Sequence, residues 1–310
     1  MSATAKAVAS SEQPSAWMRG EILRVDHFAI RVPDIERAAA WYCSVLGLQN
    51  AGRANGRTYL AAPLSGKITV ALSQGGTGLE HVSLLVRDDH ALASIRRKLS
   101  AGGMSPRDSV GDARPGAEAA LRIQLPIGSD IEFMVDAIAD KPRGGARQPQ
   151  LGAFNIVASH VQLRTPDVAG LAEFFQKVGF RMTDFAKPPG GGDLFAAFVR
   201  ANEFHHQFAL FSGRAGLHHI ALEIDEVDFL KIGDHFTRLG VTAEYGPGRH
   251  KPARSIFIYV RDPFGNRIEI TSPMEMVGHE QPPSQLTDPF SFLVNMWGPQ
   301  PPDSWMKDWT

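Results

Sequence analysis

Residues 218–224 read HHIALEI, a histidine followed by alternating apolar residues, and this stretch decides the fold because the chain repeats its form. Three further segments share the pattern: VDHFAIRV (25–32), LEHVSLLV (79–86) and SHVQLRT (159–165). Alternation with a period of two is typical of strands that bury one face. We therefore predict four equivalent strands, which carry the histidines His27, His81, His160 and His219.

A short amphipathic helix is predicted after each of these strands. The segments PDIERAAAWYCSVLGL (33–48) and PDVAGLAEFFQKVGF (166–180) both open with Pro-Asp and close around a glycine. RDDHALASIRRKLSAGG (87–103) and DEVDFLKIGDHFTRLG (225–240) also end in glycine. Pro and Asp suit the start of a helix, and Gly suits its exit. Each strand is thus the first part of a strand–helix unit.

The two halves of the chain also end alike. LPIGSDIEFMVD (125–136) and VRDPFGNRIEITSP (260–273) are each a glycine-containing turn followed by a strand with a glutamate. Equivalent residues lie at nearly constant offsets: 133 from His27 to His160, 138 from His81 to His219, and 137 from Glu132 to Glu269. Such constancy indicates a tandem duplication of a unit of ~120 residues, each unit holding two strand–helix–strands repeats.

Length and composition exclude several classes of protein. The chain has 310 residues, 32 basic and 33 acidic side chains, and a hydrophobic fraction of 43%, enough for packed cores. The formal charge of -1 gives no overall attraction for nucleic acid or an anionic membrane. The single Cys43 excludes an internal disulfide and a zinc finger. No apolar run is long enough to span a bilayer, and the N-terminus lacks a signal-peptide core, so we expect a cytoplasmic protein.

Five segments follow from these patterns. We expect an N-terminal arm (1–21), an N-terminal domain (22–139), a Pro/Gly-rich linker (140–155), a catalytic C-terminal domain (156–273) and a Trp/Pro-rich tail (274–310). Three of the five tryptophans lie in the tail, namely Trp297, Trp305 and Trp309. Because exposed Trp is costly, we expect the tail to pack on the body or on a neighbouring subunit.

Three residues of the second half are candidate metal ligands. His160, His219 and Glu269 lie on three separate predicted strands, which would bring them together if the strands line one curved sheet. Two imidazoles and a carboxylate on one face of a metal leave adjacent positions open, an arrangement that suits non-haem Fe(II). A lone histidine on a strand is more often an ordinary core residue, but three in register with a duplicated fold favour a metal site.

The stretches LHHIALE, GPGRH (246–250) and IFIYVRDPFGNRIEI together resemble the two-domain extradiol (type I) ring-cleaving dioxygenases of the vicinal oxygen chelate, or glyoxalase, superfamily. The resemblance covers about residues 22–272. It implies an α+β fold of tandem βαβββ modules, in which paired modules form an incomplete β-barrel around a metal site. It also implies extradiol cleavage of a catechol-type ring by Fe(II), or Mn(II) as in some relatives, with both atoms of O₂ entering a ring-opened semialdehyde or keto acid in aromatic degradation.

The resemblance also implies roles for individual residues. His160, His219 and Glu269 would bind the metal. His206 would be the acid/base residue, with His205 as the fallback for that role. His250 and Tyr259 would contact the bound catechol, and we expect His218 to point away from the site. Arg249 and Arg254 flank His250 and are further candidates for substrate contact.

The N-terminal half keeps His27, His81 and Glu132 but lacks the other site residues. Ile68, Ala113 and Arg122 stand about where His206, His250 and Tyr259 would be. We expect a non-catalytic scaffold there, although a second, structural metal stays open.

Two other functions remain as alternatives. A glyoxalase-like isomerase would take four ligands from both halves, namely His27, Glu132, His160 and Glu269, and a non-enzymatic ligand-binding protein of the same fold would need no metal. The matched strands lack a cluster of Arg and Lys, so a neutral or weakly polar catechol is favoured over a dicarboxylate. From the family we expect a homodimer or homotetramer.

Overall fold

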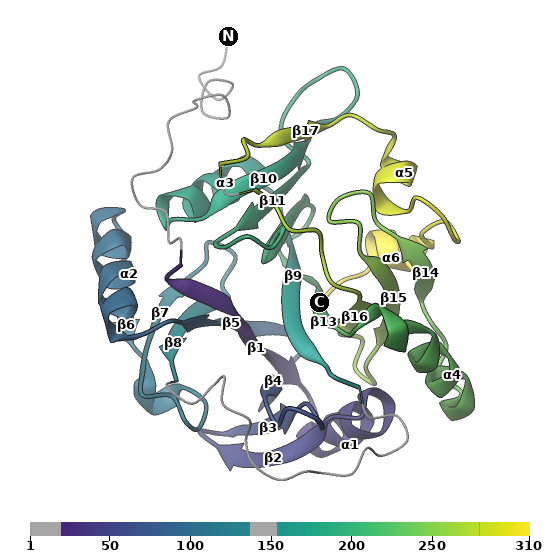
Figure 1. The fold of residues 1–310 in the computed structure, drawn as a ribbon, viewed down its shortest axis with the longest axis horizontal. Coiled ribbons are helices and arrows are strands. Elements are labelled where there is room, and N and C mark those ends of the chain that lie inside the picture. Colours follow the sequence, from purple (N-terminus) through teal and green to yellow (C-terminus); the bar gives the residue numbers. More distant parts are fainter. Residues whose placement is uncertain (1–19, 137–153, 279) are drawn as a thin grey trace.

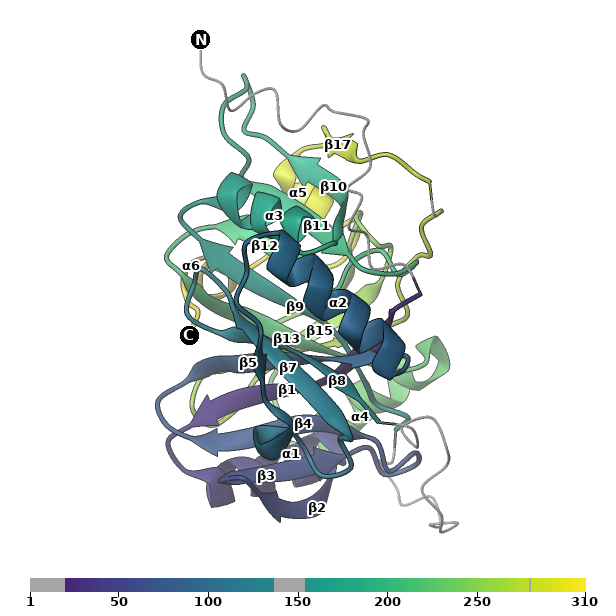
Figure 2. The same ribbon diagram turned by 90° about the vertical axis from the view of Figure 1, so that its left-hand side faces the viewer.

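The fold consists of two sheets with helices on their outer faces (Figures 1 and 2). The computed structural model describes residues 20–136, 154–278 and 280–310. Most of the expected arm and linker lies outside these residues. The described first half contains β1 (Ile22–Val32), α1 (Ile35–Leu46), β2 (Gln49–Ala54), β3 (Arg57–Ala61), β4 (Ile68–Gln74), β5 (Gly78–Val86), α2 (Asp89–Ala101), β6 (Arg107–Asp108), β7 (Ala119–Gln124) and β8 (Asp130–Val135).

The second half repeats this order of elements. It contains β9 (Val157–Thr165), α3 (Val168–Lys177), β10 (Arg181–Ala186), β11 (Ala196–Arg200), β12 (Phe208–Ser212), β13 (Gly216–Glu223), α4 (Phe229–Leu239), β14 (Tyr245–Arg249), β15 (Ile256–Arg261) and β16 (Arg267–Thr271). A tail follows with β17 (Ser284–Leu286), α5 (Phe290–Val294) and α6 (Asp303–Lys307).

The strand orders confirm the predicted α+β fold of tandem βαβββ modules. The first sheet runs β2-β3-β4-β1-β5-β8-β7-β6, and the second runs β14-β15-β16-β13-β9-β12-β11-β10-β17. In each sheet the two strands that open a module are central neighbours and antiparallel, β1 with β5 and β9 with β13. Each of these four strands also pairs in parallel with the last strand of its own module. Within the described residues neither sheet closes on itself.

Helices α1 and α3 begin where the Pro-Asp signals predict. The side chain of Asp34 caps α1 by accepting a hydrogen bond from the amide of Arg37, and Gly47 ends that helix with a φ of 69°. Asp167 caps α3 in the same way through the amide of Gly170. A capping carboxylate satisfies an amide that the helix itself leaves free, and Gly adopts the left-handed exit without strain.

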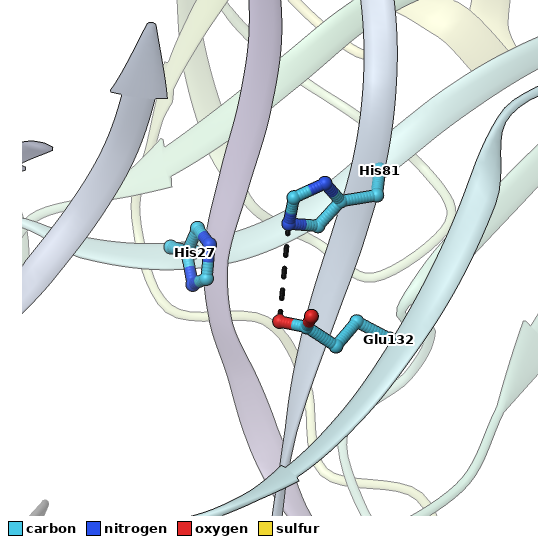
Figure 3. Close-up of side chains that lie close together, drawn as sticks. All are labelled: His27, His81 and Glu132. Carbon is cyan, nitrogen blue, oxygen red and sulfur yellow. Dashed lines mark ion pairs between the residues drawn. The ribbon is translucent and has the colours of Figure 1, made fainter. Parts of the chain in front are cut away.

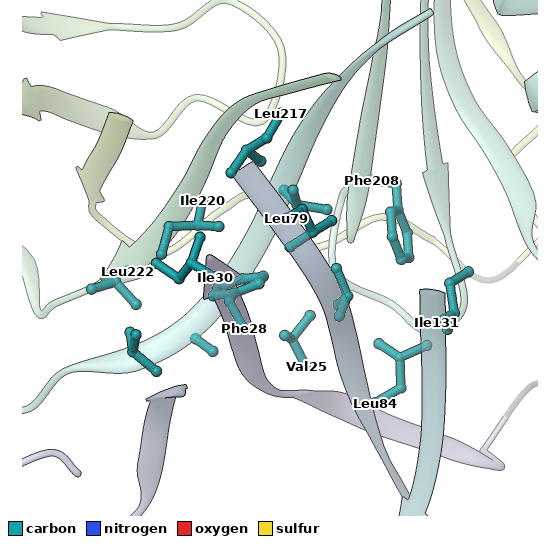
Figure 4. Packing of buried hydrophobic residues seen from close by; sticks show 14 of the residues in the cluster. Val25, Phe28, Ile30, Leu79, Leu84, Ile131, Phe208, Leu217, Ile220 and Leu222 are labelled. Atoms are coloured by element: carbon teal, nitrogen blue, oxygen red, sulfur yellow. The ribbon is translucent and has the colours of Figure 1, made fainter. Parts of the chain in front are cut away.

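The two halves share one hydrophobic cluster. Figure 4 shows Val25, Phe28 and Leu84 of the first half in the same cluster as Phe208 and Ile220 of the second. Polar contacts join the halves as well, since Asn266 donates to the carbonyl of Arg31 and accepts from the amide of Gly78. The two expected domains are therefore not separate bodies, because they pack against each other and share one hydrophobic cluster.

The C-terminal tail packs on the second half of the chain. Strand β17 extends the second sheet by pairing with β10. The Trp305 side chain is 2% exposed, and the indole of Trp309 donates to the carbonyl of Arg214. The expectation of a packed tail is confirmed at these two residues, whereas Trp297 is 49% exposed on this chain, and its packing on a neighbouring subunit stays a prediction. No helix among the described residues is long and apolar enough to cross a membrane.

Replacing Trp305 with Ala should lower the free energy of unfolding by about 3–5 kcal/mol, because it empties a buried aromatic site. Trp297→Ala, at an exposed position of the same tail, should change it by no more than about 0.5 kcal/mol. Urea unfolding followed by circular dichroism measures both. Equal effects of the two substitutions would contradict the packing of the tail.

Candidate metal centre

A β-bulge precedes each of the four strand histidines. The pairing of β1 with β5 shifts register around Asp26 and Glu80, the residues before His27 and His81. The pairing of β13 with β9 shifts likewise around His218 and Ser159, which precede the histidines of the second half. Bulges re-aim side chains and are common next to active sites. Here they break the simple alternation of the strands and place a polar neighbour beside each histidine.

His160, His219 and Glu269 meet in the second half. The Nε2 atoms of the two histidines lie 3.3 Å and 2.9 Å from Oε2 of Glu269, and the ligand atoms of all three residues lie within 4.8 Å of one another. They come from the neighbouring strands β9, β13 and β16, where Ala221 pairs with both His160 and Glu269. All three side chains are buried.

The donor atoms of this triad fit a divalent metal ion. Ligands about 2.1 Å from a metal and at right angles to each other are about 3 Å apart, as the Nε2–Oε2 distances are. Both carboxylate oxygens of Glu269 and Nε2 of His219 are buried and have no hydrogen-bond partner of acceptable geometry. Because buried polar atoms are normally paired, these unpaired atoms are consistent with a site that could bind an ion.

The electrostatics of the triad favour its deprotonated, metal-binding form. Burial alone would raise the pKa of Glu269, but His160, His219 and His250 outweigh it and hold that pKa well below its usual range. Burial lowers the pKa of His219 to about 4, although Glu269 opposes the shift. A carboxylate and a neutral imidazole are the forms that bind metals.

Two adjacent histidines lie before β12, and only one of them faces the triad. The ring of His206 is 4.5 Å from that of His160, and burial together with the nearby His160 holds the pKa of His206 well below its usual value. His205 instead contacts Asp184, at 3.0 Å from Nε2 to the carboxylate. The geometry therefore favours His206 over His205 as the residue that acts in the site.

His250 and Tyr259 complete the polar side of the site. Nε2 of His250 lies 3.0 Å from the Tyr259 hydroxyl and 3.6 Å from Oε1 of Glu269. The other ring nitrogen of His250 donates to the carbonyl of Val294 in the tail, at 2.6 Å. Burial, with the nearby Glu269, raises the pKa of Tyr259 well above its usual value, so the hydroxyl stays protonated and can donate.

A cavity opens onto the triad, and its walls are mostly apolar. It is lined by His160, His206, His219, His250, Tyr259 and Glu269, and by apolar side chains that include Phe195, Phe198, Phe211, Phe290, Leu293 and Trp305. No Lys or Arg lines it, so Arg249 and Arg254 are not brought to the site. Arg249 bonds the carbonyl of Arg254, whose own side chain pairs with Glu275.

The equivalent triad of the first half already holds a positive charge. Figure 3 shows His27, His81 and Glu132 close together, with His81 paired to Glu132 at 3.9 Å. Here Arg122 donates to Oε2 of Glu132 at 2.8 Å, and Ser83 donates to Oε1 at 2.9 Å. Both oxygens that are unpaired in Glu269 are therefore satisfied in Glu132.

Arg122 also lies close to His81, one of the two histidines of this triad. Its guanidinium lies 3.5 Å from Nε2 of His81 and is held by Asp112 at 2.6 Å. It lies opposite Glu132 in the pairing of β7 with β8, as Tyr259 lies opposite Glu269. The cation of Arg122 therefore stands beside the position that a metal would need.

The structure keeps the two triads apart. The potential metal-binding groups of the described residues are His27–His81–Glu132 and His160–His219–Glu269, each confined to one half. The four-ligand set that a glyoxalase-like isomerase would need, with His27 and Glu132 beside His160 and Glu269, is not assembled.

The tail supplies Leu286, Phe290, Leu293, Val294 and Trp305 to the cavity wall. This agrees with the expectation of an aromatic tail that closes over the pocket, although the sequence did not predict which tail residues line it. His218 does not line the cavity, as expected, but alternation did not predict its contact with His219. The bulge brings Nδ1 of His218 to 2.8 Å from Nδ1 of His219, while the tail carbonyl of Trp305 lies 2.8 Å from Nε2 of His218.

Known proteins resemble most of this chain. A family model described as Glyoxalase/Bleomycin resistance protein/Dioxygenase superfamily matches residues 24–133 and 158–270. The manganese-dependent 2,3-dihydroxybiphenyl 1,2-dioxygenase of Geobacillus genomosp. 3 is 24% identical over 273 residues, covering 82% of this chain and 86% of that protein. Metapyrocatechase 2 of Cupriavidus necator is 26% identical and covers 96% of both chains.

A solved structure shares the fold. A variant of homoprotocatechuate 2,3-dioxygenase from Brevibacterium fuscum superposes with a TM-score of 0.82 at 23% identity, covering 97% of this chain and 85% of that one. Another structure of that enzyme holds 3,4-dihydroxyphenylacetate.

The same substitution should change metal binding by the protein when it is made in the second triad but not when it is made in the first. Glu269→Gln should weaken binding of Mn(II) or Fe(II) more than about 100-fold, since loss of a mere partner of a ligand already costs about 10–100-fold. Glu132→Gln should leave affinity and stoichiometry unchanged, because Arg122 occupies that carboxylate.

Equilibrium dialysis with elemental analysis measures both, with His219→Asn and His81→Asn as a second matched pair. Two tightly bound ions per wild-type chain, or equal losses in the two halves, would contradict this difference.

Proposed function

This chain belongs to the Glyoxalase/Bleomycin resistance protein/Dioxygenase superfamily, and we propose that it is an extradiol dioxygenase that cleaves a catechol-type ring with O₂. The observation that carries the proposal is the buried His160–His219–Glu269 triad, which opens onto a cavity lined by further histidines. The curated relatives, a dihydroxybiphenyl dioxygenase and metapyrocatechases, support the same reaction. The product is a ring-opened semialdehyde or keto acid of aromatic degradation.

We assign the metal to the triad of the second half. A bound Fe(II), or Mn(II) as in one relative, would act as a Lewis acid and leave adjacent positions for catechol and O₂. The protein's part is to hold three ligands on one face, and burial lowers the pKa of His219 so that this imidazole stays neutral. The first half serves as a scaffold, in which the Arg122 guanidinium takes the place of a metal ion.

His206 is the acid/base residue of the proposed reaction. It lines the cavity beside His160, and its lowered pKa keeps it neutral and able to accept a proton from a catechol hydroxyl. The same nitrogen can return that proton to an oxygen of a later intermediate.

His250 and Tyr259 hold the substrate oxygens. Nε2 of His250 lies 3.0 Å from the Tyr259 hydroxyl and 3.6 Å from Oε1 of Glu269, so both side chains are directed toward the triad. A protonated Tyr259 can donate to an oxygen that becomes negative as the ring opens, a form of stabilisation that is strongest in a dry site.

The cavity fits a catechol with an uncharged apolar substituent. Its walls carry phenylalanines, leucines and a tryptophan but no cationic side chain. A substrate carboxylate buried there would lose its hydration without gaining a partner. This points to alkyl- or aryl-substituted catechols and away from acids such as 3,4-dihydroxyphenylacetate. The homodimer or homotetramer and the cytoplasmic location stay predictions.

His206→Asn should lower kcat by about 10²–10⁴-fold, the usual contribution of a general acid/base, while bound metal stays at the wild-type level. Oxygen uptake by the metal-loaded variant measures the rate, and elemental analysis measures the metal. His90→Asn, at an exposed histidine, is the control and should be as active as the wild type. Wild-type turnover in the His206 variant would refute the assignment.

A substrate panel tests both the reaction and the character of the cavity. The anaerobically Fe(II)-loaded protein should consume one O₂ per 2,3-dihydroxybiphenyl or alkylcatechol and form a yellow ring-fission product. For 3,4-dihydroxyphenylacetate kcat/KM should be at least about 100-fold lower, given the cost of burying an unpaired charge. No uptake with any member of the panel would contradict the proposed reaction, and a preference for the acid would contradict the proposed substrate class.

A further inference from the structure

A chain of three polar side chains runs from Asp184 to the cavity. The Asp184 carboxylate lies 3.0 Å from Nε2 of His205. The other ring nitrogen of His205, Nδ1, lies 2.9 Å from Nδ1 of His206. His206 lines the cavity and contacts His160, so the chain ends at the proposed metal centre.

The fold holds this chain in a buried and fixed position. Asp184, His205 and His206 are 9%, 5% and 5% exposed. The Thr183 hydroxyl donates to the carbonyl of His205 at 2.7 Å, which fixes the backbone of the histidine pair. The ring of Phe198 packs edge-on against both imidazoles. These contacts leave neither imidazole free to rotate.

The carboxylate at one end of this chain determines which ring nitrogens of His205 and His206 carry protons. A carboxylate can only accept, so Nε2 of His205 carries the proton that faces Asp184. In the neutral imidazole Nδ1 of His205 is then an acceptor, and Nδ1 of His206 must donate to it. The remaining nitrogen of His206, Nε2, is then unprotonated and can accept a proton from a group in the cavity.

We propose that Asp184 and His205 are positioning residues, which fix the ring and tautomer of His206 so that its Nε2 is the free nitrogen in the cavity. The proposal deepens the proposed function and rests on His206 as its acid/base residue. Asp184 and His205 touch neither the triad nor the substrate position in this arrangement. They act only through His206, as the outer partner of a ligand or catalytic histidine commonly does.

The same device occurs at the neighbouring histidine pair. His218 stands between an acceptor and His219, with 2.8 Å from its Nε2 to the Trp305 carbonyl and 2.8 Å between the two Nδ1 atoms. By the same reasoning Nε2 of His219 is left unprotonated, and Nε2 is the atom that lies nearest Glu269. An outer histidine with a fixed acceptor thus orients an inner histidine twice in this site.

Paired substitutions at His205 separate positioning from general packing. His205→Leu removes the acceptor for His206 and should lower kcat about 10–100-fold, with KM and bound metal within about twofold of wild type. His205→Asn places an amide oxygen near the former Nδ1 and should recover most of that loss. Asp184→Ala should lower kcat as well, while Asp193→Ala, at an exposed position shortly after β10, should not.

The tautomer itself can be read without turnover. Imidazole ¹⁵N–¹H spectra of the protein loaded with diamagnetic Zn(II) should show the His206 proton on Nδ1 in the wild type. The His205→Leu and Asp184→Ala variants should show a mixture of tautomers. A wild-type proton on Nε2 of His206, or wild-type kcat in both variants, would overturn the proposal. If the wild type cleaves no catechol, the proposed function fails, whereas the spectra still decide the tautomer.

Discussion

The buried carboxylate of Glu269 is the constraint on which the rest of the site depends. A negative charge in the interior needs a compensating cation, and neither oxygen of Glu269 has a hydrogen-bond partner of acceptable geometry. In the duplicated half Arg122 and Ser83 satisfy the equivalent Glu132. Duplication thus produced two nearly identical triads, and the residue opposite the glutamate, Tyr259 in one and Arg122 in the other, distinguishes the proposed metal centre from the proposed scaffold.

The bulges explain how one fold serves both halves. Each central strand inserts an extra residue before its histidine. In the second half His218 links His219 to the tail, while in the first half Asp26 binds His27 at 2.9 Å and pairs with Arg114. The tail carbonyls of Val294 and Trp305 extend the same principle, because each accepts from a histidine of the site or of its immediate surroundings.

Much of this could be predicted from the sequence, because repeats carry both topology and register. The constant offsets between histidines and glutamates predicted the modules and the convergence of His160, His219 and Glu269. The alternation rule could not reveal bulges, so the contact of His218 with His219 was not predicted. Proximity in sequence to His250 suggested Arg249 and Arg254, but their side chains pair outside the cavity. The tail lies outside the repeat, so no pattern predicted which of its residues would line the site.

The central claim is that one half binds metal and the other replaces it with Arg122. Anomalous diffraction from crystals of the Mn(II)-loaded protein, recorded on both sides of the manganese absorption edge, tests it most directly. The account predicts one peak per chain, within coordination distance of His160, His219 and Glu269, and none between His27, His81 and Glu132. A peak at the first-half triad, or none at the second, would contradict it.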